Sequence, residues 1–374
     1  MLRLGLGLLK KVKPIAQPWL AIIGHSIDIG TKKALVILRV RADILSRKEG
    51  AIQLQDCECI GLRISETVNG NSVALESGEI FQHAGTPAAI IKDCDRTLNK
   101  GVNLWQEKQE LDIPVIEDIS HVMASALKKQ YEDTEGYRNF TSLISKSAKN
   151  LRQTALAFLA PPKLRTKGRF LSIGRLGRWG ERILDLLDVG KDRKDDDSLN
   201  KVRAALPDIN DSKSFIQSFA GTAKTVSQVM ELLKNKGLNN STFSECHSLM
   251  EKLSDAQTVK KSLRDWLNQH FIIRGKVTHF SLPVSSDIIE SLFGRFKHML
   301  ERNPQADMNR SALLIPVLCG TLNESVIRDA LNSAPHDALK KWEQDNIPYT
   351  MRKKRREFFG ETKPKTGNAS AGKT

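Results

Sequence analysis

The sequence predicts an α/β protein with a mixed β-sheet and a large all-helical insertion. Short β-rich runs and helical patterns alternate over residues 19–125. Residues 126–280 instead show almost only the three- and four-residue apolar spacing of helices. Acidic residues follow a strand or begin a helix at three separated places, Asp28, Asp93 and Glu290. Together these observations indicate a core whose functional carboxylates come from distant parts of the chain.

The first half of the predicted core is a set of three strands and one helix. Residues 21–23 and 34–40 are β-rich and are joined by Asp28-Ile-Gly30-Thr31, which favours an antiparallel hairpin. Residues 60–65 form a weaker third strand. Residues 73–82 have the pattern of a short helix.

The second half of the core consists of two strand–helix units. The fully apolar run 88–91 is typical of a buried strand and is followed by Asp93, after which residues 98–105 show a helical pattern. Residues 113–119 then predict a short strand, and residues 121–127 a helix. Three early strands, a helix and two strand–helix units is the order of a ribonuclease-H-like fold.

Composition shifts along the chain divide it into five parts. The lead contains basic residues and two prolines, the middle is almost wholly helical, and the tail lacks core residues. We expect a basic linker (1–18), the first part of the core (19–125), a helical insertion (126–280), a core completion that carries Glu290 (281–345) and a basic, disordered tail (346–374).

The net charge of +15 and the pI of about 9.6 favour a polyanion as partner. Basic proteins gain affinity for DNA because their side chains release counterions from the phosphates. No apolar run reaches the roughly 18 residues that a membrane helix needs. Five scattered cysteines are typical of a reduced protein without structural disulfides. We therefore expect a cytoplasmic, nucleoid-associated DNA-binding protein with neither a membrane partner nor a small-molecule substrate.

Two carboxylates have the positions that a metal site for phosphoryl transfer needs, and each also has a structural interpretation. Asp93 follows a buried strand, where ligands of a metal pair converge, but an Asp there can also cap a helix. Asp95, nearer the helix, is the better candidate for the cap. Asp287 and Glu290 match a capping box, which would occupy Glu290 unless Ser286 caps the helix instead.

Other polar residues have the positions of supporting or DNA-contacting groups. Asp118 and His121 follow the next predicted strand, where a histidine either orients a ligand or is an ordinary core histidine. Basic side chains after a double proline, on the Glu290 helix and in the tail are candidates for contacts with DNA phosphates, although each is equally typical of a solvated segment. They are Lys163, Arg165, Lys167, Arg169, Arg295, Lys297, Lys353, Lys354 and Arg355.

Two glycine patterns do not support a nucleotide site. Gly174-x-x-Gly177-x-x-Gly180 has the wrong spacing for a dinucleotide loop, and no second parallel strand follows it. Gly221-Thr-Ala-Lys224-Thr225 lacks the glycine that directly precedes the lysine of a phosphate loop.

Several stretches together resemble the DDE transposases of bacterial insertion sequences that carry a helical insertion before the final Glu. The resemblance covers roughly residues 19 to 360. It rests on Gly24-His25-Ser26-Ile-Asp28-Ile-Gly30, Ile90-Ile-Lys-Asp93, Asp118-Ile-Ser-His121, Gln153 to Pro162 with Lys167-Gly-Arg169, and Ile288-Ile-Glu290-Ser-Leu-Phe-Gly-Arg-Phe-Lys297.

The resemblance implies a ribonuclease-H-like enzyme that uses two Mg²⁺ or Mn²⁺ ions to cut and join DNA ends. It places the family's middle Asp at Asp93 and the Glu at Glu290. The family's first Asp falls on Gly24, so the bridging carboxylate is missing and activity should fall by orders of magnitude. Asp28 lies on the same strand face but about 13 Å further along, so it would replace the carboxylate only if the strand slid or bent.

The resemblance also implies a DNA-end-binding region before the core and a homodimer acting on paired ends. Because this chain begins almost at the first strand, we expect a truncated, degenerate copy. The alternatives are a non-catalytic DNA-binding remnant of a transposase and another ribonuclease-H-fold nuclease such as a resolvase.

Overall fold

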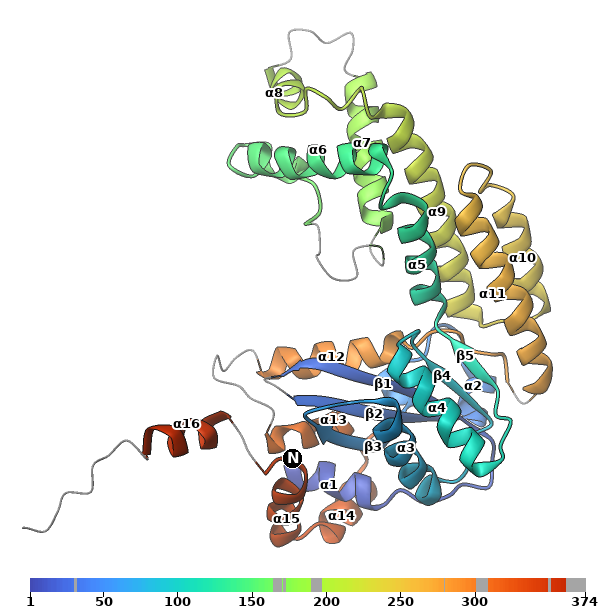
Figure 1. The fold of residues 1–374 in the computed structure, drawn as a ribbon, viewed down its shortest axis with the longest axis vertical. Helices are drawn as coiled ribbons and strands as arrows, with labels where there is room; N and C mark the ends of the chain where they lie inside the picture. Colours follow the sequence, from blue (N-terminus) through green and yellow to red (C-terminus); the bar gives the residue numbers. More distant parts are fainter. Residues whose placement is uncertain are drawn as a thin grey trace, which may run out of the picture.

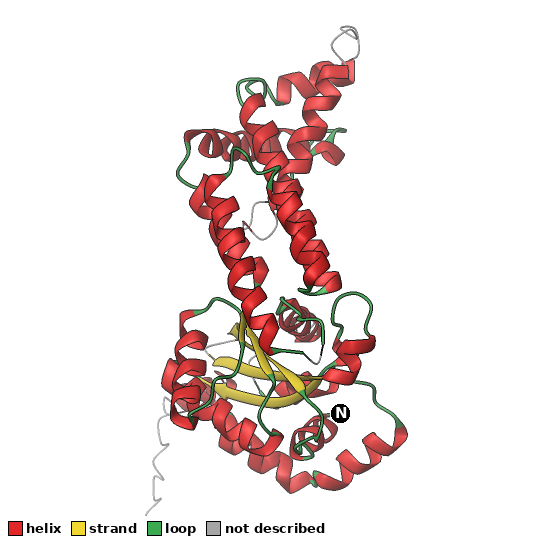
Figure 2. Ribbon diagram, turned by 90° about the vertical axis from the view of Figure 1, so that its right-hand side faces the viewer, coloured by secondary structure: helices red, strands yellow, loops and turns green. Residues whose placement is uncertain are grey.

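The computed structural model shows an elongated protein, with a β-sheet at one end and a helical body at the other (Figure 1). It describes residues 1–29, 32–163, 170, 173–189, 197–278, 280–300, 309–348 and 351–360, and within these the side chains of 26–29, 173 and 351–353 lie outside the description. Figure 2 shows the strands gathered at one end and helices everywhere else.

The sheet has five strands in the order β3-β2-β1-β4-β5. Strands β1 to β3 pair antiparallel, whereas β4 and β5 extend the sheet parallel to β1. Their bounds are Trp19–Ile29 (β1), Lys32–Arg41 (β2), Glu58–Ser65 (β3), Ala89–Lys92 (β4) and Val115–Glu117 (β5). This order and these directions are those of a ribonuclease-H-like sheet, and the predicted fold class is confirmed.

The two faces of β1 are covered by different helices because side chains alternate along a strand. Trp19, Ala21 and Ile23 pack under α3 (Gly70–Ala84) and α4 (Arg96–Gln109). Leu20 and Ile22 point the other way, into a second core that includes α12 (Asp287–Leu300). The helix that carries Glu290 therefore packs on the face opposite α3 and α4.

The N-terminal segment is a helix packed into the protein, which differs from the linker expected for residues 1–18. Helix α1 (Leu2–Lys10) buries Leu4 and Leu6. Its glycines allow close approach, since a Cβ on Gly5 would overlap the carbonyl oxygen of Leu313. Apolar and glycine residues alternate in this helix, which is why the sequence pattern did not reveal its packing.

The remaining helices at the sheet end of the molecule lie near α1 or beside the sheet. They are α2 (Ala42–Arg47), η1 (Leu54–Asp56), η4 (Arg310–Leu313), α13 (Leu314–Val317), α14 (Glu324–Ser333) and α15 (His336–Asn346). A last helix, α16 (Met351–Gly360), forms where a disordered tail was expected. Residues 361–374 of that tail lie outside the described residues.

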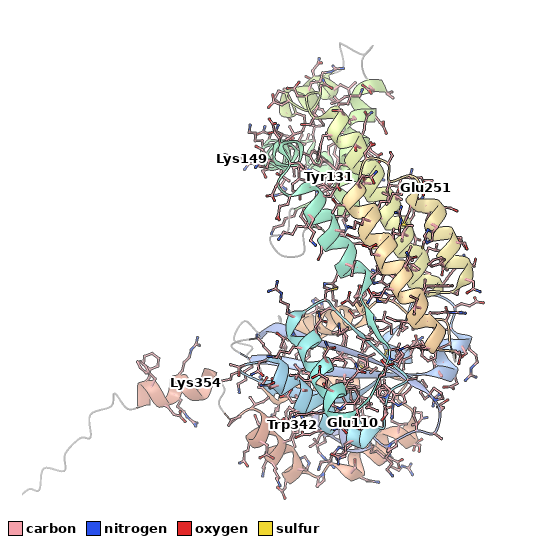
Figure 3. All side chains as sticks on the ribbon, turned by 45° about the vertical axis from the view of Figure 1, so that its right-hand side comes forward. Glu110, Tyr131, Lys149, Glu251, Trp342 and Lys354 are labelled. Carbon is pink, nitrogen blue, oxygen red and sulfur yellow. The ribbon has the colours of Figure 1, made fainter. Side chains whose placement is uncertain are left out.

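The helical body between β5 and α12 is continuous with the core, because one apolar cluster runs from the sheet into it. Its helices are α5 (Ile119–Tyr131), α6 (Glu135–Arg152), η2 (Ala157–Leu159), α7 (Ile173–Val189), α8 (Asp197–Ala205), α9 (Lys213–Lys236), α10 (Asn240–Met250) and α11 (Gln257–Lys276). In Figure 3, Tyr131 marks the far end of α5 and Lys149 lies on α6 beyond it.

The glycines at 174–180 serve helix packing. They lie on α7 facing α9, where a Cβ on Gly177 would be 3.0 Å from the Cα of Ala220 and one on Gly180 would be 2.6 Å from Ile216 Cγ2. Small residues at this spacing let two helices approach closely, which accounts for the glycine pattern without a nucleotide.

Helix α11 covers the free edge of the sheet at β5. Trp266 Nε1 donates to the carbonyl of Glu117 at 3.0 Å, and the Glu117 N–H donates to His270 Nε2 at 3.0 Å. Both edge groups of Glu117 are thereby paired, so the edge offers no open hydrogen bonds there. No described helix has the length and apolar character needed to cross a bilayer.

Candidate functional site

The candidate site lies where β1 and β4 end together. Ile23 pairs with Lys92, so Asp93, the residue after β4, stands level with Gly24. Asp93 is half-buried, and its Oδ1 accepts the N–H of Asp95 at 2.9 Å. Asp95 is the N-cap of α4 and accepts the N–H groups of Thr97 and Leu98 at 2.7 and 3.1 Å. Asp93 therefore does not cap the helix.

Glu290 projects from the first turn of α12 and is exposed. Helix α12 begins at Asp287, whose carboxylate pairs with Lys234 of α9. Asp287 is thus inside the helix and not its cap, so the capping box with Glu290 is not formed. The carboxylate of Glu290 is left for contacts across the site.

Asp118 is a buried structural hub. Its Oδ1 accepts the N–H of Ser120 at 2.6 Å and so caps α5. Its Oδ2 accepts the N–H and the hydroxyl of Ser286 at 2.6 and 2.7 Å. Since Ser286 immediately precedes α12, this one side chain fixes the start of α5 against the start of α12.

This junction brings His121 of α5 and Glu290 of α12 together. His121 Nε2 lies 3.6 Å from Glu290 Oε1, an ion-pair distance slightly long for a hydrogen bond. The interaction with Glu290 has the largest effect and raises the pKa of His121, against the lowering effect of burial. The charges of Asp118 and Asp93 raise this pKa further, so Asp93 and Glu290 both act on the same imidazole.

The space in front of Gly24 on β1 is filled by an apolar side chain. A Cβ built on Gly24 would lie 2.6 Å from Ile289 Cγ2, closer than real Cβ atoms come. Ile289 is buried and immediately precedes Glu290 on α12. Gly24 therefore faces the helix that carries Glu290, and Ile289 occupies the space that a side chain at position 24 would need.

His25, the next residue of β1, faces the opposite side. Its Nε2 lies 3.2 Å from Asp95 Oδ1, and its side chain is only 8% exposed. Burial alone would raise the pKa of Asp95, but the hydrogen bonds from His25, Leu98 and Thr97 lower it. His25 and Asp95 thus pin β1 to the start of α4. Sequence reasoning missed this pair, although strand alternation after Gly24 was a signal for it.

Lys92, the last residue of β4, is buried beside the site and donates to Asn99 of α4. Burial lowers its pKa, while the charges of Glu117, Cys94 and Asp93 partly offset that effect. Sequence reasoning did not single out Lys92, because a lysine at the end of an apolar run is usually solvated.

The predicted DNA-contacting residues are spread over three regions. Lys163 and Arg295 are exposed, Lys297 is half-buried, and Arg355 is exposed on α16. Lys354 of α16 lies 3.4 Å from Glu66. Arg165, Lys167 and Arg169 lie outside the described residues, as do the side chains of Lys353 and Asp28.

The described side chains do not fit a two-metal centre. Within these parts of the chain, no three His, Cys, Asp or Glu residues group closely enough to hold a metal ion. Asp93 and Glu290 carry hard oxygen ligands, but the space at Gly24, where a third carboxylate was expected in the family pattern, is taken by Ile289. No cleavage step through a metal pair follows from this arrangement.

Comparison with known proteins finds likeness to solved structures, and the one described below is distant in sequence. No family model and no curated protein matches the sequence. Among solved structures, the chain is similar to the Drosophila P element transposase strand transfer complex, with 10% sequence identity and a TM-score of 0.39. The match covers 89% of this chain and 85% of that chain. At this level of similarity, the fold class rests on the sheet topology described above.

Proposed function

We propose that the protein is a DNA-binding protein on a transposase-type core of insertion-sequence descent, with impaired metal-dependent cleavage and strand transfer. The packing of Ile289 against Gly24 carries the proposal, because it fills the place of the bridging carboxylate. Asp93 and Glu290 both raise the pKa of His121, which supports a former DDE site at this place.

DNA as the partner is supported by charge. The chain has a net charge of +15, and exposed Arg295 lies on the same helix as Glu290. Basic side chains beside a site contribute phosphate contacts that weaken as salt rises. A homodimer on paired ends belongs to the same proposal and is testable from the stoichiometry of the DNA complex.

A second candidate is a transposase that still cuts DNA, with an acid other than residue 24 as the third ligand. The retained Asp93 and Glu290 favour it, and Asp28 is the residue to examine. In that case Mg²⁺ or Mn²⁺ would support nicking by the unaltered protein.

The experiment measures DNA binding and nicking in parallel on DNA that flanks the gene, in Mg²⁺ and in Mn²⁺. It compares the unaltered protein with Gly24→Asp, Ile289→Ala and the Gly24→Asp/Ile289→Ala pair, and uses Glu290→Ala in the paired background as control. We expect salt-dependent binding throughout and nicking only by the paired variant, since shortening the side chain of Ile289 makes room for a carboxylate at position 24.

Other results contradict separate parts of the proposal. Nicking by the unaltered protein that requires Asp28 would favour the second candidate. No nicking by a paired variant that folds and binds DNA would reject the site assignment. Absence of any DNA binding would reject the proposal as a whole.

A further inference from the structure

Helix α16 combines a dense positive charge with exposed aromatic rings. Its sequence holds five consecutive basic residues at 352–356 and one acid, Glu357, followed by Phe358 and Phe359. Every side chain that the structure describes in α16, from residue 354 onward, is exposed. The helix stands apart from the body in Figure 1, and Figure 3 labels Lys354 on it.

The two phenylalanines expose most of their surface. Phe358 is 71% and Phe359 67% exposed, and the rings meet edge to face with centroids 5.3 Å apart. Large apolar rings beside a basic run are what proteins use on unpaired nucleic acid, where cations follow the phosphates and rings stack on bases.

The attachment of α16 places it at the edge of the sheet that carries the candidate site. Lys354 contacts Glu66, the residue directly after β3. Strand β3 runs in the same direction as β1 and β4, so Glu66 and Asp93 leave the sheet at the same edge. Strand spacing and rise put them roughly 20 Å apart.

The charge of α16 distinguishes between its possible binding partners. A ten-residue helix is marginal alone in water, so binding would stabilise it. A second copy of α16 would bring a like-charged run and repel it. A polyanion is attracted, and the nearby site edge makes DNA the polyanion that the structure favours.

We propose that α16 is an arm that binds unpaired DNA, next to the edge at which Asp93 leaves the sheet. The basic residues contact phosphates, and Phe358 and Phe359 stack on unpaired bases. This inference rests on the proposed DNA-binding function and adds to it a preference for single-stranded segments.

The test compares binding of the full chain to a labelled single-stranded oligonucleotide and to the duplex of the same sequence. Phe358→Ser/Phe359→Ser should weaken single-strand binding by about tenfold or more and leave duplex binding unchanged. Arg355→Gln/Arg356→Gln should weaken both and reduce the single-strand salt slope by about 1.4. Ile272→Ser, an apolar residue of α11 that is 72% exposed, is the matched control and should change neither affinity.

Several outcomes would overturn the arm. The role of α16 would be rejected if Phe358→Ser/Phe359→Ser bound the single strand as tightly as the unaltered protein. Duplex binding by both proteins in that case would leave the proposed function standing. The aromatic variant could instead lose binding to anionic phospholipid vesicles, or lose self-association, and still bind single-stranded DNA as the unaltered protein does. That result would assign the two rings to another partner. If the unaltered protein binds neither DNA, the proposed function and the arm fail together.

Discussion

Asp118 and Ser286, 168 residues apart in sequence, are joined by two hydrogen bonds of 2.6 and 2.7 Å to one carboxylate oxygen. The contact closes the two ends of the helical body onto each other. It sets the first turns of α5 and α12 side by side, and His121 and Glu290 face each other as a result. A structural carboxylate thus positions the candidate site.

Asp118→Ala should destabilise the protein by about 3 kcal/mol, because the buried N–H groups of Ser120 and Ser286 lose a charged acceptor. Urea denaturation measures the change. Asp112→Asn is the control, since Asp112 is exposed and its ion pair with Lys276 contributes little. Equal stability of the two variants would contradict the hub role of Asp118.

Gly24→Ala should cost about 1–3 kcal/mol of folding free energy because its Cβ overlaps Ile289. Combined with Ile289→Ala, the loss should be smaller than the sum of the two single losses. Gly294→Ala, on the open side of α12, should instead stabilise by up to about 1 kcal/mol. Additive losses at Gly24 and Ile289 in a double-mutant cycle would argue against direct contact.

The pKa of His121 should lie above its ordinary value, and Glu290→Gln should lower it more than Asp93→Asn does. Because the pKa is raised in the folded state, the ion pair contributes its full stabilisation at pH values below the unfolded pKa. This stabilisation is lost as the pH rises through the folded pKa. Histidine NMR titration of the unaltered protein and of the two variants measures these His121 pKa values. A His121 pKa that Glu290→Gln leaves unchanged would contradict an ion pair between His121 and Glu290.

His270 should make the protein sensitive to acid. Its pKa is lowered to about 4, mainly by burial; the hydrogen bond to the Trp266 carbonyl opposes this effect, and the charge of Lys92 adds to it. Because the folded pKa is depressed, stability is full above the unfolded value and falls as pH drops from about 6.5 towards 4, by roughly 3 kcal/mol.

His270→Gln provides the comparison for this pH dependence. The variant should be less stable at pH 7, since the stacking on Trp266 is lost, but its stability should change less between pH 7 and pH 4.5. Unfolding curves at the two pH values give the difference. Parallel losses in both proteins would assign the acid sensitivity to other groups.

The order of strands and helices along residues 19–125 could be predicted from the sequence, because strand alternation and helical spacing are local properties. The order of the strands within the sheet came from their pairing in the structure. The sequence also determined which acids could face one another, since residues after parallel strands leave the sheet at one edge. Asp93 was singled out because it follows a buried apolar run, and Glu290 because it begins a late amphipathic helix that resembles the Glu-bearing segment of the family. The interpretation of Asp95 as the better helix cap also depended only on local chain geometry.

The side chain that fills the space at Gly24 depends on tertiary packing. Ile289 lies 265 positions further along the chain, and no local pattern links a glycine in a strand to a methyl group on a distant helix. The same holds for α1, whose glycines look like helix breakers in sequence but allow backbone contact with Leu313. Local preferences set the elements, whereas steric fit between elements depends on packing that a sequence pattern does not encode.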